Sequence, residues 1–354
     1  MSLTDVNLFR IDGTLGSVSN ISTASLNGGP LAGTRNRIIN GDMRIDQRNA
    51  GASVTALDSY AVDRWQYEGS QTSKFTLQQN AGSVTPPAGF INYYGATSSS
   101  AYSVTASDFF FIGQRIEGFN VDDFALGTVN AKIVTLSFWV RSSLTGTFGG
   151  ALSNSAGNRS YPFSYSISTA NTWEQKSITI AGDTSGTWVT NSGLGLRVRF
   201  SLGAGSTYSS TAGAWAGTNY ISATGATSVV GTNGATFYIT GVQLESGAVA
   251  TPFEQRPIGT ELALCQRYFQ VLRSLRLSGY TTVGNELAWP IAYNTAMRGN
   301  PTGTSTDFTL NNVASAAQPF PTNMNAASGG LRIISGGGGV TSAIDGNLTL
   351  EAEL

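Results

Sequence analysis

The stretch Val134-Thr-Leu-Ser-Phe-Trp-Val-Arg141 places an apolar side chain at every second position. A period of two is typical of a β-strand with one buried and one exposed face. The same alternation recurs at 194–201, and shorter strand-like runs lie at 74–78, 176–180 and 237–244. Turn signals rich in Gly, Ser and Asp, such as 181–186, separate these runs. Residues 36–256 are therefore predicted to form an antiparallel β-sandwich of the jelly-roll type.

The composition also favours a β-rich structural protein. Of the 354 residues only 12% are charged, 43 are Gly, and 40% are hydrophobic. The hydrophobic share suffices for packed cores, and the length predicts more than one domain. Few charges and many small residues suit short strands joined by turns. They also suit surfaces that pack against copies of the same chain.

The chain has no His and a single Cys, which excludes several kinds of site. Without His, Ser-His-Asp and Cys-His hydrolases and His-ligated zinc or iron sites are ruled out. Without a second Cys an intrachain disulfide is ruled out, and Cys265 is expected to be a small buried hydrophobic residue. Any catalytic chemistry would then have to come from carboxylates.

The charge and hydropathy patterns point away from nucleic acids and membranes. The 20 basic residues are spread among 21 acidic ones, whereas a nucleic-acid partner would need clustered Lys and Arg. The sequence has no stretch of about 18 apolar residues that would span a membrane. Residues 1–6 lack the basic and apolar regions of a secretory signal. We expect a soluble protein, made in a cytoplasm, that neither binds nucleic acid nor inserts into a membrane.

Three segments flank the predicted jelly roll. Residues 1–35 carry isolated apolar residues among Ser, Thr and Gly, so they form either a disordered tail or an extended arm that orders against a partner. Residues 257–270 are predicted to form a short linking helix with Thr260 as its N-cap. Residues 271–354 predict a second small β-sandwich, whose thin core would gain from trimerisation. The expected fold class is all-β, preceded by an extended N-terminal arm.

Six motifs extend the argument beyond composition. They are Arg37-Ile-Ile-Asn-Gly-Asp-Met-Arg-Ile-Asp-Gln-Arg-Asn-Ala-Gly51, Tyr60-Ala-Val-Asp-Arg-Trp65, Phe237-Tyr-Ile-Thr-Gly-Val-Gln-Leu-Glu245, Glu261-Leu-Ala-Leu-Cys-Gln-Arg-Tyr-Phe269, Met297-Arg-Gly-Asn-Pro-Thr302 and Glu351-Ala-Glu-Leu354. In this order they resemble the jelly-roll module, the junction and the C-terminal tip domain of phage tail-fibre and other virion proteins. The resemblance covers residues 36–354.

This resemblance implies a non-enzymatic virion protein on the outside of a phage particle. It implies a homotrimer that attaches to host cell-surface polysaccharide and is anchored to other virion proteins through residues 1–35. Multivalency would then turn weak sugar contacts into firm attachment. A second interpretation stays open, in which the chain is a neck, capsid or baseplate decoration that contacts only other virion proteins.

The opening and closing motifs also look like those of family-4-type carbohydrate-binding modules. That family typically holds a structural calcium through an acidic residue just after the opening Asn-Gly and through Asp residues in the last strand. Asp42 follows Asn40-Gly41 and is the calcium candidate, but Thr240-Gly241 stands where the paired Asp would be. Since calcium takes six to eight oxygen ligands, the departure implies a severely weakened site.

Glycan binding by a jelly roll uses aromatic rings that stack on sugar faces. The candidates are Trp215, Tyr208, Tyr220, Tyr161, Tyr93 and Tyr94, several of them in Gly/Ser-rich loops. Trp215 is the first candidate because small residues flank it. The alternative is that its ring fills space beneath a loop or at a trimer interface. The run Phe109-Phe-Phe111 predicts a strand buried on both sides or a subunit contact.

Carboxylate catalysis is the remaining enzymatic alternative. The available acids are Asp122, Asp123, Glu117, Asp63 and Glu68. A glycosidase needs two carboxyl groups that face each other about 5–9 Å apart, whereas adjacent residues on a strand point to opposite faces. The chain also lacks the repeats of the long β-helices that phage depolymerases usually resemble. No catalytic residue is predicted, and no cofactor beyond the calcium considered at Asp42.

Overall fold

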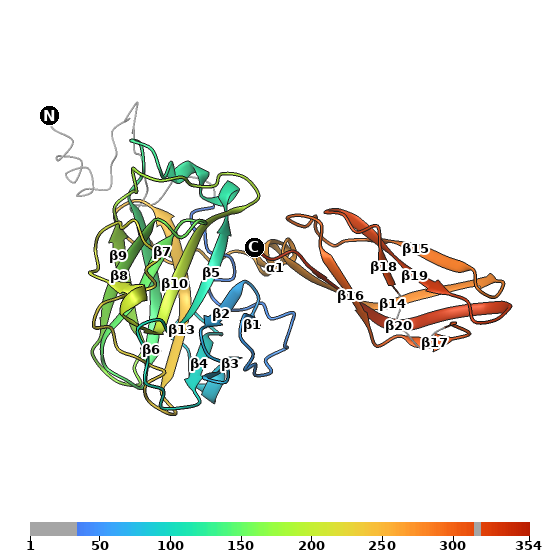
Figure 1. Cartoon of the computed structure of the whole chain (residues 1–354), viewed down its shortest axis with the longest axis horizontal. Coiled ribbons are helices and arrows are strands. Elements are labelled where there is room, and N and C mark those ends of the chain that lie inside the picture. Colours follow the sequence, from blue (N-terminus) through green and yellow to red (C-terminus); the bar gives the residue numbers. More distant parts are fainter. Residues whose placement is uncertain (1–33, 315–319) are drawn as a thin grey trace, which may run out of the picture.

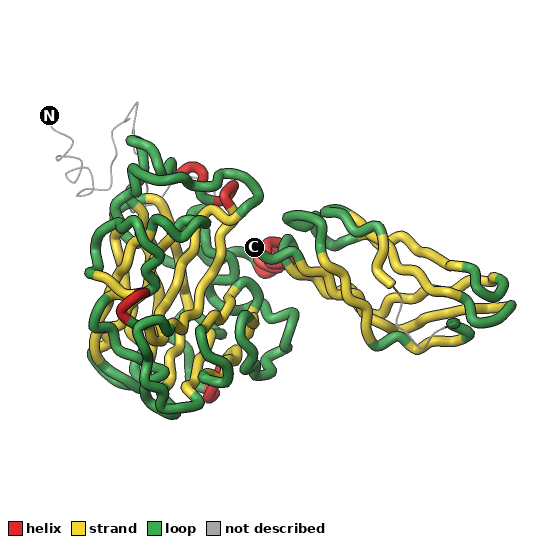
Figure 2. Tube along the Cα trace, viewed as in Figure 1, coloured by secondary structure: helices red, strands yellow, loops and turns green. Residues whose placement is uncertain are grey.

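The computed structural model describes residues 34–314 and 320–354, and it consists of two β lobes joined by one short α-helix (Figure 1). Strands fill both lobes, and helical turns are confined to short pieces between them (Figure 2). The all-β fold class predicted from the sequence is confirmed. The predicted arm at 1–35 lies almost wholly outside the described residues.

The first lobe is a sandwich of two antiparallel sheets. The six-stranded sheet has the order β1 (Ser59–Val62), β2 (Trp65–Gly69), β5 (Phe109–Glu117), β10 (Leu194–Ala204), β7 (Gly146–Ser153) and β8 (Ser160–Ile167). The five-stranded sheet has the order β3 (Phe75–Gln79), β4 (Tyr94–Ser98), β13 (Thr236–Ser246), β6 (Val134–Ser142) and β9 (Glu174–Ile180). In each sheet some neighbouring strands come from distant parts of the chain, such as β5 beside β10 and β4 beside β13, as in a jelly roll.

Short elements lie in the loops of this lobe. They are a two-residue parallel pair, β11 (Ser209–Ser210) with β12 (Ser222–Ala223), and the 3₁₀ turns η2 (Ala81–Ser83), η3 (Gly118–Asn120), η4 (Asp122–Phe124) and η5 (Ser206–Tyr208). Residues 205–227, which contain η5, β11 and β12, are called the covering loop below. Its β12 lies against β7, β8 and β10 of the six-stranded sheet.

The core of the first lobe lies between the two sheets. Leu136, Phe138 and Val140 of β6 and Leu196, Val198 and Phe200 of β10 are fully buried in one cluster. The rings of Phe138 and Phe200 meet edge to face, with centroids 4.9 Å apart. Burial of each large side chain stabilises the fold by roughly 1.5–3 kcal/mol. The alternation predicted for both strands is confirmed.

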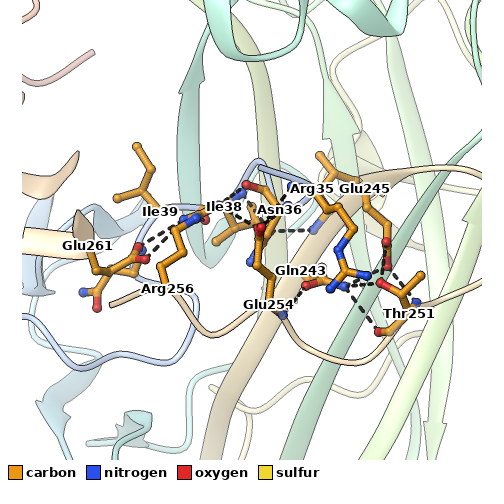
Figure 3. Close-up of polar contacts among 12 residues, drawn as sticks. Arg35, Asn36, Ile38, Ile39, Gln243, Glu245, Thr251, Glu254, Arg256 and Glu261 are labelled. Carbon is orange, nitrogen blue, oxygen red and sulfur yellow. Dashed lines mark hydrogen bonds and ion pairs between the residues drawn. The ribbon is translucent and has the colours of Figure 1, made fainter. Parts of the chain in front are cut away.

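The opening segment, residues 34–45, is hydrogen-bonded to the closing strand β13. Backbone bonds run from Arg37 N to the Leu244 carbonyl at 2.8 Å and from Val242 N to the Gly41 carbonyl at 2.9 Å. The Asn36 side chain donates to the Val242 carbonyl at 3.0 Å and accepts from Leu244 N at 3.1 Å. The two ends of the jelly roll are therefore closed by one continuous set of contacts (Figure 3).

Arg256 connects this closure to the linking helix. Its buried guanidinium donates to the carbonyls of Asn36 and Ile38 and to both carboxylate oxygens of Glu261, at 3.2 and 3.3 Å. Glu254 accepts from the backbone N–H of Asn36 at 2.8 Å (Figure 3). One guanidinium thus joins the opening segment, the residues after β13 and the helix.

Gly41 is required where the opening segment passes β13. A Cβ atom there would lie 2.2 Å from the Val242 carbonyl oxygen, which belongs to the backbone and cannot move aside cheaply. We expect Gly41→Ala to lower the free energy of unfolding by about 1–3 kcal/mol in urea denaturation. Gly217→Ala is the matched control, because a Cβ there meets nothing within 4 Å. Equal stability of the two variants would contradict the packing described.

The linking helix α1 runs over Ile258–Gln266 and is shorter than the predicted 257–270. Its N-cap is Pro257 instead of Thr260, because the Pro257 carbonyl already accepts from Glu261 N at 3.1 Å. Cys265 is fully buried, as expected for a small hydrophobic residue. Among the described residues no helix is long and apolar enough to cross a membrane.

The second lobe is a smaller sandwich. One sheet holds β14 (Phe269–Thr281), β20 (Gly339–Glu351), β16 (Thr302–Thr306) and β17 (Thr309–Asn311), and the other holds β15 (Glu286–Ala292), β19 (Ser328–Ile334) and β18 (Phe320–Thr322). Its core is thin, as predicted, and centres on Leu272, Leu277, Leu331, Ile333, Leu348 and Leu350. Strand β14 was missed by the sequence analysis because the predicted helix covered its first residues.

Buried ionic contacts join the two lobes. Glu117, at the end of β5, is 1% exposed and accepts from Arg267 at 2.6 and 2.8 Å and from the Tyr268 hydroxyl at 2.9 Å. Arg64 pairs with Glu353 and lies over the ring of Tyr268. The Glu351-Ala-Glu-Leu354 motif therefore belongs to the junction between the lobes.

The buried carboxyl group of Asp63, close to this junction, is expected to make the free energy of unfolding depend on pH. Burial raises its pKa to about 6 in spite of hydrogen bonds from Gln47 and the nearby charge of Arg48. An unfolded Asp has a pKa near 4, so the native state holds this proton more tightly. The contribution of Asp63 is therefore most favourable below about pH 4 and is lost as the pH rises to about 6.

We expect Asp63 to account for a loss of about 2–3 kcal/mol in the free energy of unfolding between these two pH values. Asp63→Asn should remove that part of the pH dependence, because the amide does not titrate. Urea denaturation of both proteins at about pH 4 and pH 7 measures the difference. The same pH dependence in both proteins would contradict the assignment.

Candidate functional site

The outer face of the six-stranded sheet carries an unusual set of side chains. On β5, Phe110 and Ile112 face the core, so Phe109 and Phe111 lie on the outer face, where their rings stack at 5.9 Å. On β10 the same alternation places Arg197 on that face. The Phe109–Phe111 run is thus packed on both sides of the sheet, although Phe109 keeps part of its ring exposed.

The covering loop partly encloses this face. Tyr208 packs its ring edge to face against Phe109, with centroids 5.1 Å apart, and is itself half-buried. Asn219 and the Tyr220 carbonyl accept hydrogen bonds from Arg199 at 3.0 and 3.2 Å. Of the sequence candidates, Tyr220 therefore lies beside Arg199, and Tyr208 lies against Phe109 on the same face.

Three arginines and one carboxylate determine the charge of this face. Arg115 of β5 donates to Glu68 of β2 at 2.8 Å and to the Leu354 carbonyl. Arg197 donates to the carbonyls of Asn154 and Ser155, both at 3.0 Å.

Arg199 is more deeply placed. It is 3% exposed, lies over the Phe111 ring at 5.5 Å and donates to Ser153 at 2.7 Å. Burial, followed by the charge of Arg197, lowers the pKa of Arg199 to about 9, so the side chain is still a cation at neutral pH.

These side chains surround a small depression. It is lined by Gln66, Glu68, Phe111, Gly113, Gln114, Arg115, Arg197, Val198 and Arg199. Its volume of about 10 Å³ is roughly the space that one water molecule needs. The half-exposed rings of Phe109 and Tyr208 belong to the same face. The arrangement offers ring surfaces for a sugar and charged donors for its polar groups.

Trp215 belongs to a different aromatic cluster. Its indole N–H donates to the Ala181 carbonyl at 2.7 Å, and its ring meets the edges of Tyr161 at 5.4 Å and Trp188 at 5.5 Å. Tyr161 is buried, and both tryptophans are half-buried at the margin of the core. This geometry matches the alternative raised from the sequence, a ring that fills space beneath loops. Trp188 was not among the sequence candidates.

The prediction that Tyr93 and Tyr94 bind sugar is wrong, because both side chains are fully buried. Tyr94 faces the core from β4, while Tyr93 packs between Trp173 and Tyr238 at 5.5 and 5.2 Å. The Tyr93 hydroxyl donates to the Ala81 carbonyl at 2.6 Å. Neither ring has a face available to a ligand, because each fills space on its own side of the five-stranded sheet.

The calcium candidate Asp42 is engaged by a neighbouring cation. Its carboxylate pairs with the Arg44 side chain, and burial raises the pKa of Asp42. In the last strand Gly241 supplies no side-chain oxygen. No group of three or more His, Cys, Asp or Glu side chains that could hold a metal ion occurs in residues 34–314 and 320–354. Asp42 is thus better described as an ion-pair partner.

Four of the five candidate acids have other partners. Glu117 is bound to Arg267 and Tyr268, Glu68 to Arg115, and Asp63 to Gln47. Asp122 and Asp123 lie exposed on the 3₁₀ turn η4 instead of on a strand. Asp123 pairs with Arg37 at 2.9 Å.

Comparison with known proteins finds only solved structures of low similarity to this chain. No protein-family profile matches it, and no curated protein is similar to it in sequence. The enzymatically active domain of bacteriophage CBA120 tailspike protein 4 matches 60% of this chain at 12% identity with a TM-score of 0.33, and the match spans only 21% of the tailspike chain.

Two carbohydrate-binding modules are similar to the same extent. A family-61 module in complex with β-1,4-galactotriose matches 60% of this chain and 99% of its own, at 12% identity and a TM-score of 0.31. The family-11 module of Clostridium thermocellum, in complex with a mixed-linked tetrasaccharide, matches 57% and 100%, at 12% identity and a TM-score of 0.29. Likeness at this level transfers neither ligand nor activity to the present chain.

Proposed function

We propose that this chain binds carbohydrate on the outer face of its six-stranded sheet. The observation that carries the proposal is a row of contacts along this face, in which Tyr208 packs on Phe109, Phe109 stacks on Phe111, and Arg199 lies over Phe111. Sugar sites commonly combine an apolar ring surface with a few fixed polar groups. Strands β5 and β10 hold Phe109 and the two arginines, Arg197 and Arg199, and the hydrogen-bonded covering loop holds Tyr208. The site is therefore largely pre-formed.

The wider role that we propose is attachment of a phage particle to host-surface polysaccharide, as a non-enzymatic fibre-type component on the outside of the particle. The support for this role is the ordered set of six sequence motifs that resembles tail-fibre and other virion proteins. In this role residues 1–35 would anchor the chain to other virion proteins.

We further propose that the protein is a homotrimer. Tyr280, Val283 and Val340 are large apolar residues on the second lobe that are 81%, 66% and 59% exposed. Tyr280 and Val340 are paired neighbours on β14 and β20, so they form one apolar surface. Burial of that surface against sister copies would support a lobe with a thin core. Light scattering should give three times the chain mass of 37.0 kDa, and a monomer at micromolar concentration would contradict the trimer.

Polysaccharide binding of the purified full-length protein tests the proposed function. Tyr208→Ala should weaken binding to host-surface polysaccharide on the order of 10-fold, because one ring surface is lost. Phe119→Ala is the matched control, since it removes an exposed ring from the far end of β5. Equal binding by both variants would contradict the site. Absence of binding by the folded trimer would favour the decoration protein that contacts only virion partners.

A further inference from the structure

We infer that the glycan bound at this face is acidic, and that Arg197 and Arg199 receive its acid group, a carboxylate or a phosphate. The inference rests on the proposed function, because it specifies the ligand of the same site. Its basis is the uncompensated positive charge of these two arginines.

The charges at the depression are not balanced, unlike those of Arg48, Arg64, Glu351 and Glu353 at the junction between the lobes. Only 12% of the residues are charged, yet Arg115, Arg197, Arg199 and Glu68 all line one depression. Glu68 is the single carboxylate among the described residues of that lining, and it is paired with Arg115. Two positive charges therefore remain without a negative partner at this face.

The partners of Arg197 and Arg199 are neutral. Arg197 donates to two backbone carbonyls, and Arg199 donates to a hydroxyl, an amide oxygen and a carbonyl. These contacts satisfy some of the N–H groups but leave the charges uncompensated. A buried cation without a counter-ion is costly, so a ligand that supplies the negative charge gains that energy on binding.

The other two buried arginines of the described chain, Arg64 and Arg256, each have a carboxylate partner, whereas the half-buried Arg298 donates only to backbone carbonyls. Arg64 pairs with Glu353, Arg256 with Glu261, and Arg159 with both carboxylate oxygens of Asp183. Arg199 is as deeply buried as Arg64, yet it has no carboxylate partner among the described residues. The contrast points to a counter-ion supplied from outside.

The dimensions of the depression agree with an acid group. A volume of about 10 Å³ accommodates one oxygen-sized group but no sugar ring. The acid oxygen of one sugar would point into the depression, and neighbouring sugars of the same chain would extend along β5 toward Phe109 and Tyr208, because Phe109 lies four residues from Gly113, the strand partner of Arg199. Guanidinium groups match the planar geometry of carboxylates and phosphates through paired N–H donors.

The test compares acidic polysaccharides with their neutral forms, using the full-length protein in calorimetric titrations. One pair is polygalacturonate and its carboxyl-reduced derivative, and the other is a phosphorylated mannan and the same mannan after dephosphorylation. We expect the acidic member of one pair to bind on the order of 10-fold more tightly, and which pair responds identifies the acid. Its affinity should fall when salt is raised from about 0.05 to about 0.5 M.

Variants assign the effect to the arginines. Arg197→Gln and Arg199→Gln should each abolish the preference for the acidic form, whereas Arg273→Gln, an exposed arginine on β14, should keep it. Arg197 is less buried than Arg199, so its variant remains informative if Arg199→Gln does not fold.

The outcomes separate the two proposals. Equal affinity for acidic and neutral forms, still weakened by Tyr208→Ala, would overturn the acidic ligand and keep the carbohydrate site. Binding to none of the four polysaccharides would count against both.

Discussion

Arg256→Ala is expected to lower the free energy of unfolding by about 3–5 kcal/mol. The guanidinium is 8% exposed and holds the carbonyls of Asn36 and Ile38 together with the carboxylate of Glu261. Without it the Glu261 carboxylate, which is 3% exposed, would be left without its cation. Glu261 also accepts from the backbone N–H of Asn40, so the loss should loosen the opening segment as well. Urea denaturation followed by tryptophan fluorescence measures the change.

Lys132→Ala is the control for this variant. Its side chain is 49% exposed, and its pairing with Asp123 at 3.7 Å is long. An exposed pair of this kind contributes about 0–1 kcal/mol, so the control should unfold almost as the unsubstituted protein does. A loss below about 1 kcal/mol for Arg256→Ala would show that the closure of the jelly roll does not depend on this guanidinium.

Arg267→Ala should have a comparable effect at the junction of the lobes. Glu117 is 1% exposed, and the variant would leave its carboxylate with the Tyr268 hydroxyl as its remaining side-chain donor. We expect a loss of about 3–5 kcal/mol, because a buried charge loses its counter-ion. Since Arg267 lies between α1 and β14, the second lobe should also unfold more independently.

Differential scanning calorimetry tests this prediction through the shape of the transition. Arg267→Ala should separate or broaden the unfolding of the two lobes, whereas Arg273→Ala, an exposed residue on β14, should leave the profile unchanged. Identical profiles for the two variants would mean that the Glu117 contacts do not couple the lobes.

The sequence predicted those parts of the fold that depend on local pattern. The alternation at 134–141 and 194–201 placed the right residues in the core, because strands that bury one face must alternate. The predicted N-cap of the linking helix was wrong by three residues, since Pro257 can cap a helix through its carbonyl without a side-chain bond. Strand β14 was missed because Phe269 continues the helical spacing of the residues before it.

The candidate site was predicted only in part, for a physical reason. Tyr208 lies at the arginine face, but Tyr93 and Tyr94 are core residues, and composition does not distinguish an aromatic that fills a core from one that covers it. The alternation of β10 already placed Arg197 and Arg199 on one face. Their neighbours on β2 and β5 follow from the strand order, which local pattern does not specify.

A crystal structure of the protein in complex with an oligosaccharide of the bound polysaccharide tests the central claim most directly. The account predicts an oligosaccharide that lies along β5, with one sugar ring against Phe109 and Tyr208 and a polar substituent of another sugar directed toward Arg197 and Arg199. A sugar bound instead over Trp215, or on the second lobe, would contradict the assignment of the outer face as the carbohydrate site.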